Sequence, residues 1–363
     1  MKLPCITMLA TLLLTAPAAA QLQITPPATT PSAPAEKQKP KPPTTAKKEA
    51  APAPKPSASP KPSPAPKPSP SPKPAATVIP APATEDPNVD LVFGAYQRGQ
   101  YKKAFELATA RAQAGDPKAM TMLGELYSNA MGIRRDYAKA AEWYKRAADA
   151  GDREAMFALA MLRISGRGGS VDKGEAVRLM ASAAKLGEPK AAYNLALLYL
   201  DGQTLPQDVK RSAELLRQAA DAGLPEAQYA LATFYKEGTG VPKDPERAVR
   251  LLQAASLADN VDAEVEYAIA MFNGTGTPKN QPAAVALLRK ASRQGSAIAQ
   301  NRLAWVLING VGTSIDKVEG FKWHLVAKTA GKGDPELDKQ LSELPAEERA
   351  KAEAAARKWL GTK

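Results

Sequence analysis

Few side chains in this sequence of 363 residues have the chemistry that metal binding or covalent catalysis needs. It contains one cysteine, Cys5, and one histidine, His324. A structural zinc site takes several thiolate and imidazole ligands, and a cysteine nucleophile needs a histidine beside it. The composition therefore argues against a cysteine–histidine zinc site, a thiol–imidazole pair and a disulfide framework, and we expect no cofactor.

One nucleophile motif recurs in the sequence. The Ser-x-x-Lys spacing of penicillin-recognising serine enzymes begins at Ser170, Ser182 and Ser314. The Ser-Asp-Asn and Lys-Thr-Gly elements of those enzymes do not accompany it. Because such matches arise by chance in a lysine-rich chain, we expect a protein without enzyme activity.

The residues around these motifs belong to a repeat of 36 residues. Six units follow one another from Asp116 to Gly331, and the last of their 36 positions is glycine in every unit but one, where it is Asp259. Positions 4 and 32 are always alanine, position 21 is aspartate or asparagine, and position 28 is always large and apolar. A fixed period of this length indicates a stack of similar structural units.

Each unit is predicted to form two helices joined by a turn. Positions 4, 8 and 11 share one face of a first helix, and positions 25, 28, 29 and 32 share one face of a second. Proline at position 2 suits the first turn of a helix, glycine at position 15 suits its left-handed end, and the position 21 side chain caps the second helix. His324 is at position 29, so we expect a packed helix residue. The Gly166–Gly169 string coincides with the turn, which argues against a phosphate-binding loop.

One such hairpin cannot bury both of its sides, so we predict an all-α fold, a solenoid of antiparallel helix pairs over residues 116–331. Residues 88–115 are predicted to form an N-terminal capping helix pair, with Ala104 and Leu107 in the register of positions 25 and 28. Residues 332–363 are predicted to form C-terminal capping helices that end in a charged, alanine-rich run. We expect a monomer whose repeat array folds on its own.

The first 20 residues have the three parts of a signal peptide. Lys2 is followed by an apolar run from Ile6 to Leu14 and by three alanines that end at Ala20. We expect export to a bacterial periplasm, or secretion, with cleavage after Ala20. An uncleaved N-terminal anchor is the alternative, although the apolar run is shorter than the roughly 20 residues that span a bilayer.

Residues 21–87 are mostly proline, lysine, alanine, serine and threonine. Such a composition has too few large apolar side chains to offset chain entropy, so we predict a disordered spacer with polyproline II character. Its excess of lysine leaves two interpretations open. The segment is either a passive tether or an element that is attracted to an anionic wall or envelope surface.

Three strings give the repeat a recognisable resemblance. They are AAYNLALLYLDG from Ala191 to Gly202, GTGVPKD from Gly238 to Asp244, and AEWYKRAADAG from Ala141 to Gly151. They resemble the Sel-one-like repeat, a relative of the tetratricopeptide repeat. The resemblance implies a superhelical adaptor that binds other proteins, and it implies kinship with exported bacterial regulators and scaffolds of envelope systems.

Positions 6, 10 and 13 of the first helix vary although the frame is constant. In the tetratricopeptide family the matching face lines a concave peptide-binding surface, so the resemblance makes these positions a candidate binding face. Many of them are apolar or aromatic, as at binding hot spots. Packing between neighbouring first helices is the competing interpretation. The candidate residues are Phe157, Met161, Ile164, Tyr193, Leu197, Tyr229, Lys236, Phe272 and Trp305.

The sequence therefore predicts a non-catalytic scaffold or regulator that binds protein partners in the cell envelope. A peptidoglycan- or polysaccharide-binding protein is one alternative, and a weak β-lactam-recognising enzyme is a more remote one. Nucleic acid is not an expected partner of an exported chain, in spite of the net charge of +12.

Overall fold

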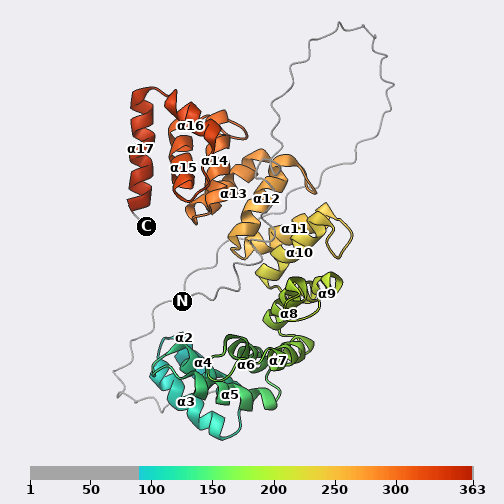
Figure 1. Cartoon of the computed structure of the whole chain (residues 1–363). Helices are drawn as coiled ribbons and strands as arrows, with labels where there is room; N and C mark the ends of the chain where they lie inside the picture. The colour runs from blue at the N-terminus through green and yellow to red at the C-terminus, as the bar shows by residue number, and fades with distance from the viewer. Residues whose placement is uncertain (1–89, 362–363) are drawn as a thin grey trace, which may run out of the picture. The chain divides into compact units, whose positions relative to one another are not determined.

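The computed structural model describes residues 90–361 (Figure 1). The predicted signal peptide and the predicted spacer lie outside the described residues. Between residues 90 and 361 every regular element is a helix, and none is long and apolar enough to cross a membrane. The helices are α2 Leu91–Gln97, α3 Tyr101–Gln113, α4 Pro117–Asn129, α5 Tyr137–Asp149, α6 Arg153–Ser165, α7 Lys173–Lys185, α8 Pro189–Asp201, α9 Val209–Asp221, α10 Pro225–Glu237, α11 Pro245–Leu257, α12 Val261–Asn273, α13 Gln281–Arg293, α14 Ala297–Asn309, α15 Lys317–Thr329, α16 Pro335–Ser342 and α17 Ala346–Gly361.

The helix pairs predicted from the 36-residue period are confirmed. Each unit contains a first helix, from α4 to α14 in even numbers, and a second helix, from α5 to α15 in odd numbers. Each helix packs against the one before it and the one after it, so the pairs form a continuous stack (Figure 1). The contacts are therefore local in sequence throughout the array.

Helix boundaries follow the capping residues. The position 21 side chain accepts a hydrogen bond from the third N–H of every second helix, as Asp208 does from Arg211 at 2.9 Å. Prolines 117, 189 and 225 begin first helices, as predicted. Position 15 ends the first helix in the left-handed region, as glycine in five units and as Ala130, with φ 59°, in the other.

A second glycine of the turn, at position 17, allows consecutive units to approach closely. At position 17, Gly168 adopts φ 74°, and a Cβ atom there would overlap the carbonyl oxygen of Tyr137 in the preceding unit. Gly240 approaches Val209 in the same way, and Gly276 approaches Pro245. The glycine string that is similar to a phosphate loop is therefore a packing contact between consecutive units.

Alanine columns let the helices approach closely, and leucines fill the spaces between them. The position 4 and position 32 alanines are all at most 2 % exposed, and Leu123, Leu159, Leu231 and Leu303 of position 8 are equally buried. Gly124 at position 9 leaves room for Tyr144 of the second helix, because a Cβ atom would overlap the tyrosine ring. Small and large residues thus interlock within and between units.

Additional helices cover both ends of the array. Helices α2 and α3 lie within residues 88–115 and bury Ala104, while Leu107 stays half-buried. At the other end, α17 packs against α15, and the rings of Trp323 and Trp359 meet edge to face at 5.0 Å. His324 is fully buried, as its repeat position predicts, and its Nε2 atom lies 2.8 Å from Asp338 Oδ1 of α16.

A fully buried carboxylate interrupts the apolar pattern of the core. Glu264, at position 5 of the fifth unit, is fully buried, and Lys290 Nζ lies 2.5 Å from its Oε1 atom. In the fourth and sixth units this position is Gln228 and Gln300. Each of these glutamines donates to a backbone carbonyl eight residues earlier, Gln300 to Ser292 at 3.1 Å. The side chains at position 5 face the second helix of the preceding unit, where a backbone carbonyl can accept a hydrogen bond from an amide.

The position 17 contact can be tested by adding one methyl group. Gly168→Ala should lower the free energy of unfolding by more than the roughly 1–2 kcal/mol of left-handed strain, because the methyl group also meets the Tyr137 backbone. Gly151→Ala is the matched control, since Gly151 has φ 89° and open space around it. Urea denaturation of both variants measures the difference, and equal losses would mean that the contact is not tight.

The buried carboxylate predicts an order of melting temperatures. Lys290→Met leaves Glu264 buried without its cation and should melt lowest, because an uncompensated buried charge is strongly unfavourable. Glu264→Gln should melt close to the parent protein, since its amide can donate to the carbonyl of Ser256 as its repeat equivalents do. The double variant should recover most of the loss. A double variant as unstable as Lys290→Met would contradict this explanation.

Candidate protein-binding face

The candidate binding residues lie on five consecutive first helices, α6, α8, α10, α12 and α14. We call the surface formed by their positions 6, 10 and 13 the variable face. Eight of the nine residues are half-buried, and Phe272 is buried, with 4 % of its surface exposed. In its present position Phe272 cannot present its ring to a partner.

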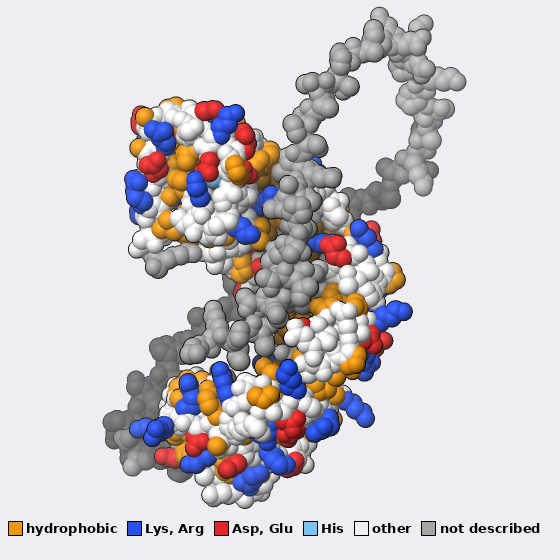
Figure 2. All heavy atoms as spheres, viewed as in Figure 1, with side chains coloured by type: hydrophobic (Ala, Val, Ile, Leu, Met, Phe, Trp, Pro, Cys, Tyr) orange, Lys and Arg blue, Asp and Glu red, His pale blue; other side chains and the backbone are white. Residues whose placement is uncertain are grey.

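The variable face also belongs to the core. Phe157, Met161, Ile164, Tyr193 and Tyr229 each pack against buried residues of the array while keeping part of their surface exposed. The competing interpretation, packing between neighbouring units, therefore describes part of their role. On the visible side of the molecule, exposed hydrophobic side chains lie among charged ones (Figure 2).

The two tyrosines lie beside carboxylates of the following unit. Burial raises the pKa of Tyr193, and the negative charge of Glu226 raises it further. Burial also raises the pKa of Tyr229, to which Glu266 and Asp262 of α12 contribute. A half-buried phenol next to an acidic side chain thus occurs twice, one repeat apart.

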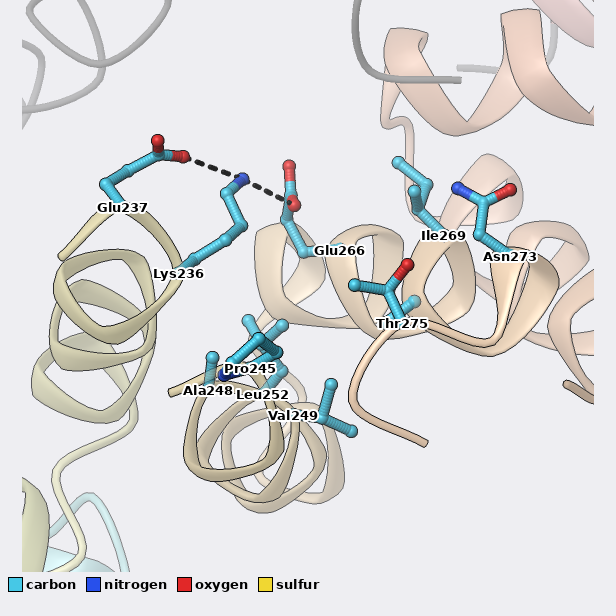
Figure 3. A pocket seen from close by; sticks show the side chains of 11 residues that line it. Lys236, Glu237, Pro245, Ala248, Val249, Leu252, Glu266, Ile269, Asn273 and Thr275 are labelled. Atoms are coloured by element: carbon cyan, nitrogen blue, oxygen red, sulfur yellow. Dashed lines mark hydrogen bonds and ion pairs between the residues drawn. The ribbon is translucent and has the colours of Figure 1, made fainter. Parts of the chain in front are cut away.

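A cavity of about 340 Å³ opens between α10, α11 and α12 (Figure 3). Lys236 lies at its rim between two carboxylates, with Nζ 3.1 Å from Glu266 and 3.8 Å from Glu237. Apolar side chains of α11, including Val249 and Leu252, form the opposite wall. The other lining residues are Pro245, Ala248, Ile269, Ala270, Asn273 and Thr275.

Of the cavity residues, only Lys236 is among the sequence candidates. The α11 residues belong to a second helix, whereas the variable positions 6, 10 and 13 lie on first helices. A signal was present at position 7, which is Met122, Ala158, Asn194 and Ala230 in the first four units and Glu266 in the fifth. It is Arg302 in the sixth unit, so charged residues appear at this position only from the fifth unit on.

The sequence motifs for chemistry do not come together in a pocket. Ser170 and Ser314 lie exposed just before the capping residues of α7 and α15, and Ser182 is exposed on α7. Within residues 90–361, no group of histidine, cysteine, aspartate and glutamate side chains is arranged to hold a metal ion.

Stacked helix pairs with one pattern of caps and small residues define an α-solenoid, a class of repeat proteins. The chain belongs to the Sel1 repeat family. Six consecutive segments match the Sel1 repeat, at residues 117–152, 153–188, 189–224, 225–260, 261–296 and 297–332. Each begins one residue after the boundary that the glycine column suggests.

Solved structures that are similar to this chain include the following two. A Sel1 repeat protein from Oxalobacter formigenes is 24 % identical with a TM-score of 0.56, and the match covers 65 % of this chain and 94 % of that one. A protective antigen present in uropathogenic Escherichia coli strains is 23 % identical with a TM-score of 0.51, covering 71 % of this chain and 64 % of the antigen. These likenesses agree with the fold. Among curated proteins, no significant match was found.

The packing of the variable face predicts graded losses of stability. Phe272→Ala should cost about 3–5 kcal/mol and Leu195→Ala about 2–5 kcal/mol, because both side chains are buried. Tyr229→Ala should cost about 1–3 kcal/mol, since only part of its ring packs against the core. Tyr229→Phe retains the packing and serves as the control. Chemical denaturation measures all four, and a Tyr229→Ala variant as stable as the parent would make this residue purely a surface group.

Proposed function

We propose that this protein is an exported, non-catalytic scaffold or regulator of a bacterial envelope process, and that protein partners bind to its variable face. The variable face carries the proposal. It places partly exposed apolar and aromatic side chains on consecutive first helices of a Sel1 repeat array. Side chains of this kind supply a large share of the energy in protein interfaces.

A repeat frame suits this role physically. The capping residues and alanine columns are nearly the same in every helix pair, whereas the side chains at the variable positions differ from unit to unit. Successive repeats then present different side chains at equivalent places, as Leu197 and Thr233 do at position 10. Such a surface recognises a partner through several repeats at once.

Export rests on the sequence of the first 20 residues. A positive residue, a short apolar run and the alanines up to Ala20 form the pattern of a cleaved signal peptide. Residues 21–87 would then precede the array in the mature protein, either as a passive tether or as a basic segment attracted to an anionic envelope surface.

Site-specific photo-crosslinking in intact cells tests the proposed function. A photoreactive amino acid in place of Leu197 on α8 should give covalent adducts with a defined set of proteins. The same amino acid at Leu257 of α11 is the matched control, because this second-helix side chain is 81 % exposed and lies outside the variable face. Mass spectrometry of the captured chain also checks export, since cleavage after Ala20 leaves Gln21 as its first residue.

The same material separates the alternatives. Identical adducts from both positions, or none from Leu197, would contradict partner binding at the variable face. Retention on purified peptidoglycan without protein adducts would favour the wall-binding alternative. Covalent labelling by a fluorescent penicillin would support an enzyme that recognises β-lactams.

A further inference from the structure

The variable face changes character where the third, fourth and fifth units meet. In the second unit positions 6, 10 and 13 are Phe157, Met161 and Ile164, all apolar. In the fourth and fifth units charged residues appear next to the tyrosines, as Lys236 at position 13 and Glu266 at position 7. This part of the array can therefore make contacts with a charged ligand as well as apolar contacts.

Negative charge exceeds positive charge at this place. Glu226 and Glu237 are exposed, and Asp262 and Glu266 act together on Tyr229. The nearby cations are Lys236, which pairs with Glu266 and Glu237, and Arg302, whose charge also acts on Glu266. Four carboxylates thus face two cations, which favours a positively charged ligand.

Apolar surface accompanies this charge. The cavity below Lys236 has walls of Val249, Leu252 and Ile269, which can accept an aliphatic or prolyl side chain. The partly exposed rings of Tyr193 and Tyr229 can stack with proline rings and attract cations. This site differs from an acidic cluster alone, because the apolar cavity lies next to the carboxylates. It can therefore bind an apolar side chain and a cation of the same ligand side by side.

The spacing of the two tyrosine–carboxylate groups indicates an extended ligand. Consecutive first helices are separated by at most two interaxial distances, about 16–20 Å. A polyproline II peptide advances about 3.1 Å per residue, so at most about six residues cover one repeat. A single helix turn or an isolated side chain would reach only one of the two groups.

We propose that the face formed by α8, α10 and α12 binds an extended, basic segment of a partner protein. A prolyl or aliphatic side chain enters the cavity, and lysine or arginine side chains lie against Glu226 and against Asp262 and Glu266. The inference rests on the proposed function, which it narrows to one class of partner. In the free protein Lys236 pairs with Glu266 and Glu237, so it competes with the incoming cation for Glu266.

Fluorescence anisotropy with a labelled synthetic peptide tests the proposal on the full chain. The peptide contains lysine–proline pairs about six residues apart, and its control has glutamate in place of lysine. Glu266→Gln should weaken binding about fivefold, whereas Lys236→Met should strengthen it by a similar factor. A purely structural role of the Lys236–Glu266 pair would change both affinities in the same direction. Binding should also weaken in high salt.

Glu214→Gln on α9 controls for net charge, because this exposed carboxylate lies on a second helix. It should leave the affinity unchanged. Equal binding of the glutamate peptide, or equal effects of Glu214→Gln and Glu266→Gln, would overturn the proposal. If replacing the chain's own lysines from Lys37 to Lys73 strengthens binding, the occupant is a segment of this chain and the assignment to a partner is wrong. Loss of peptide binding with intact crosslinking at Leu197 would refute only this inference.

Discussion

The close approach of each helix pair to the next is the contact on which the rest of the structure depends. A helical hairpin has two sides, and the apolar surface of one side stays exposed until another hairpin covers it. Position 17 glycines let backbone meet backbone, as Gly168 meets Tyr137, and the alanines at positions 4 and 32 keep the side chains between helices small. The alanines recur in every unit and the position 17 glycine in all but the third, which has Thr204, so the contact is repeated along the array and the terminal helices cover its last exposed surfaces.

The repetition makes exceptions informative. Glu264 replaces an amide in a buried column and is held by Lys290 from the second helix of the same unit. Lys236 and Glu266 likewise appear at positions that are uncharged in most other units, and their pair lies over an apolar cavity. The charge of Glu264 is neutralised inside the core by Lys290. The pair of Lys236 and Glu266 lies where a ligand can reach it, and for this reason only this pair carries the binding proposal.

The variable face combines stability and recognition in the same side chains. Tyr193 and Tyr229 lie on the candidate binding face, and part of each ring also packs against buried residues of the array. Such anchoring reduces the conformational entropy that a side chain loses on binding, which favours tight contacts. It also means that alanine substitutions there report on both properties, so binding experiments need variants such as Tyr229→Phe and Glu266→Gln that preserve packing.

The sequence alone determined the helix pairs, their ends and the class of fold, because these depend on local and periodic signals. Caps such as Asp208 act within three residues of themselves, and the 36-residue period repeats each signal six times. The burial of Phe272, the charge pair of Glu264 with Lys290, and the cavity beside Lys236 were decided only by the tertiary structure. Each depends on the angle and distance between neighbouring helices. The repeat pattern shows which side chains are equivalent, but it does not give the distance between two helices.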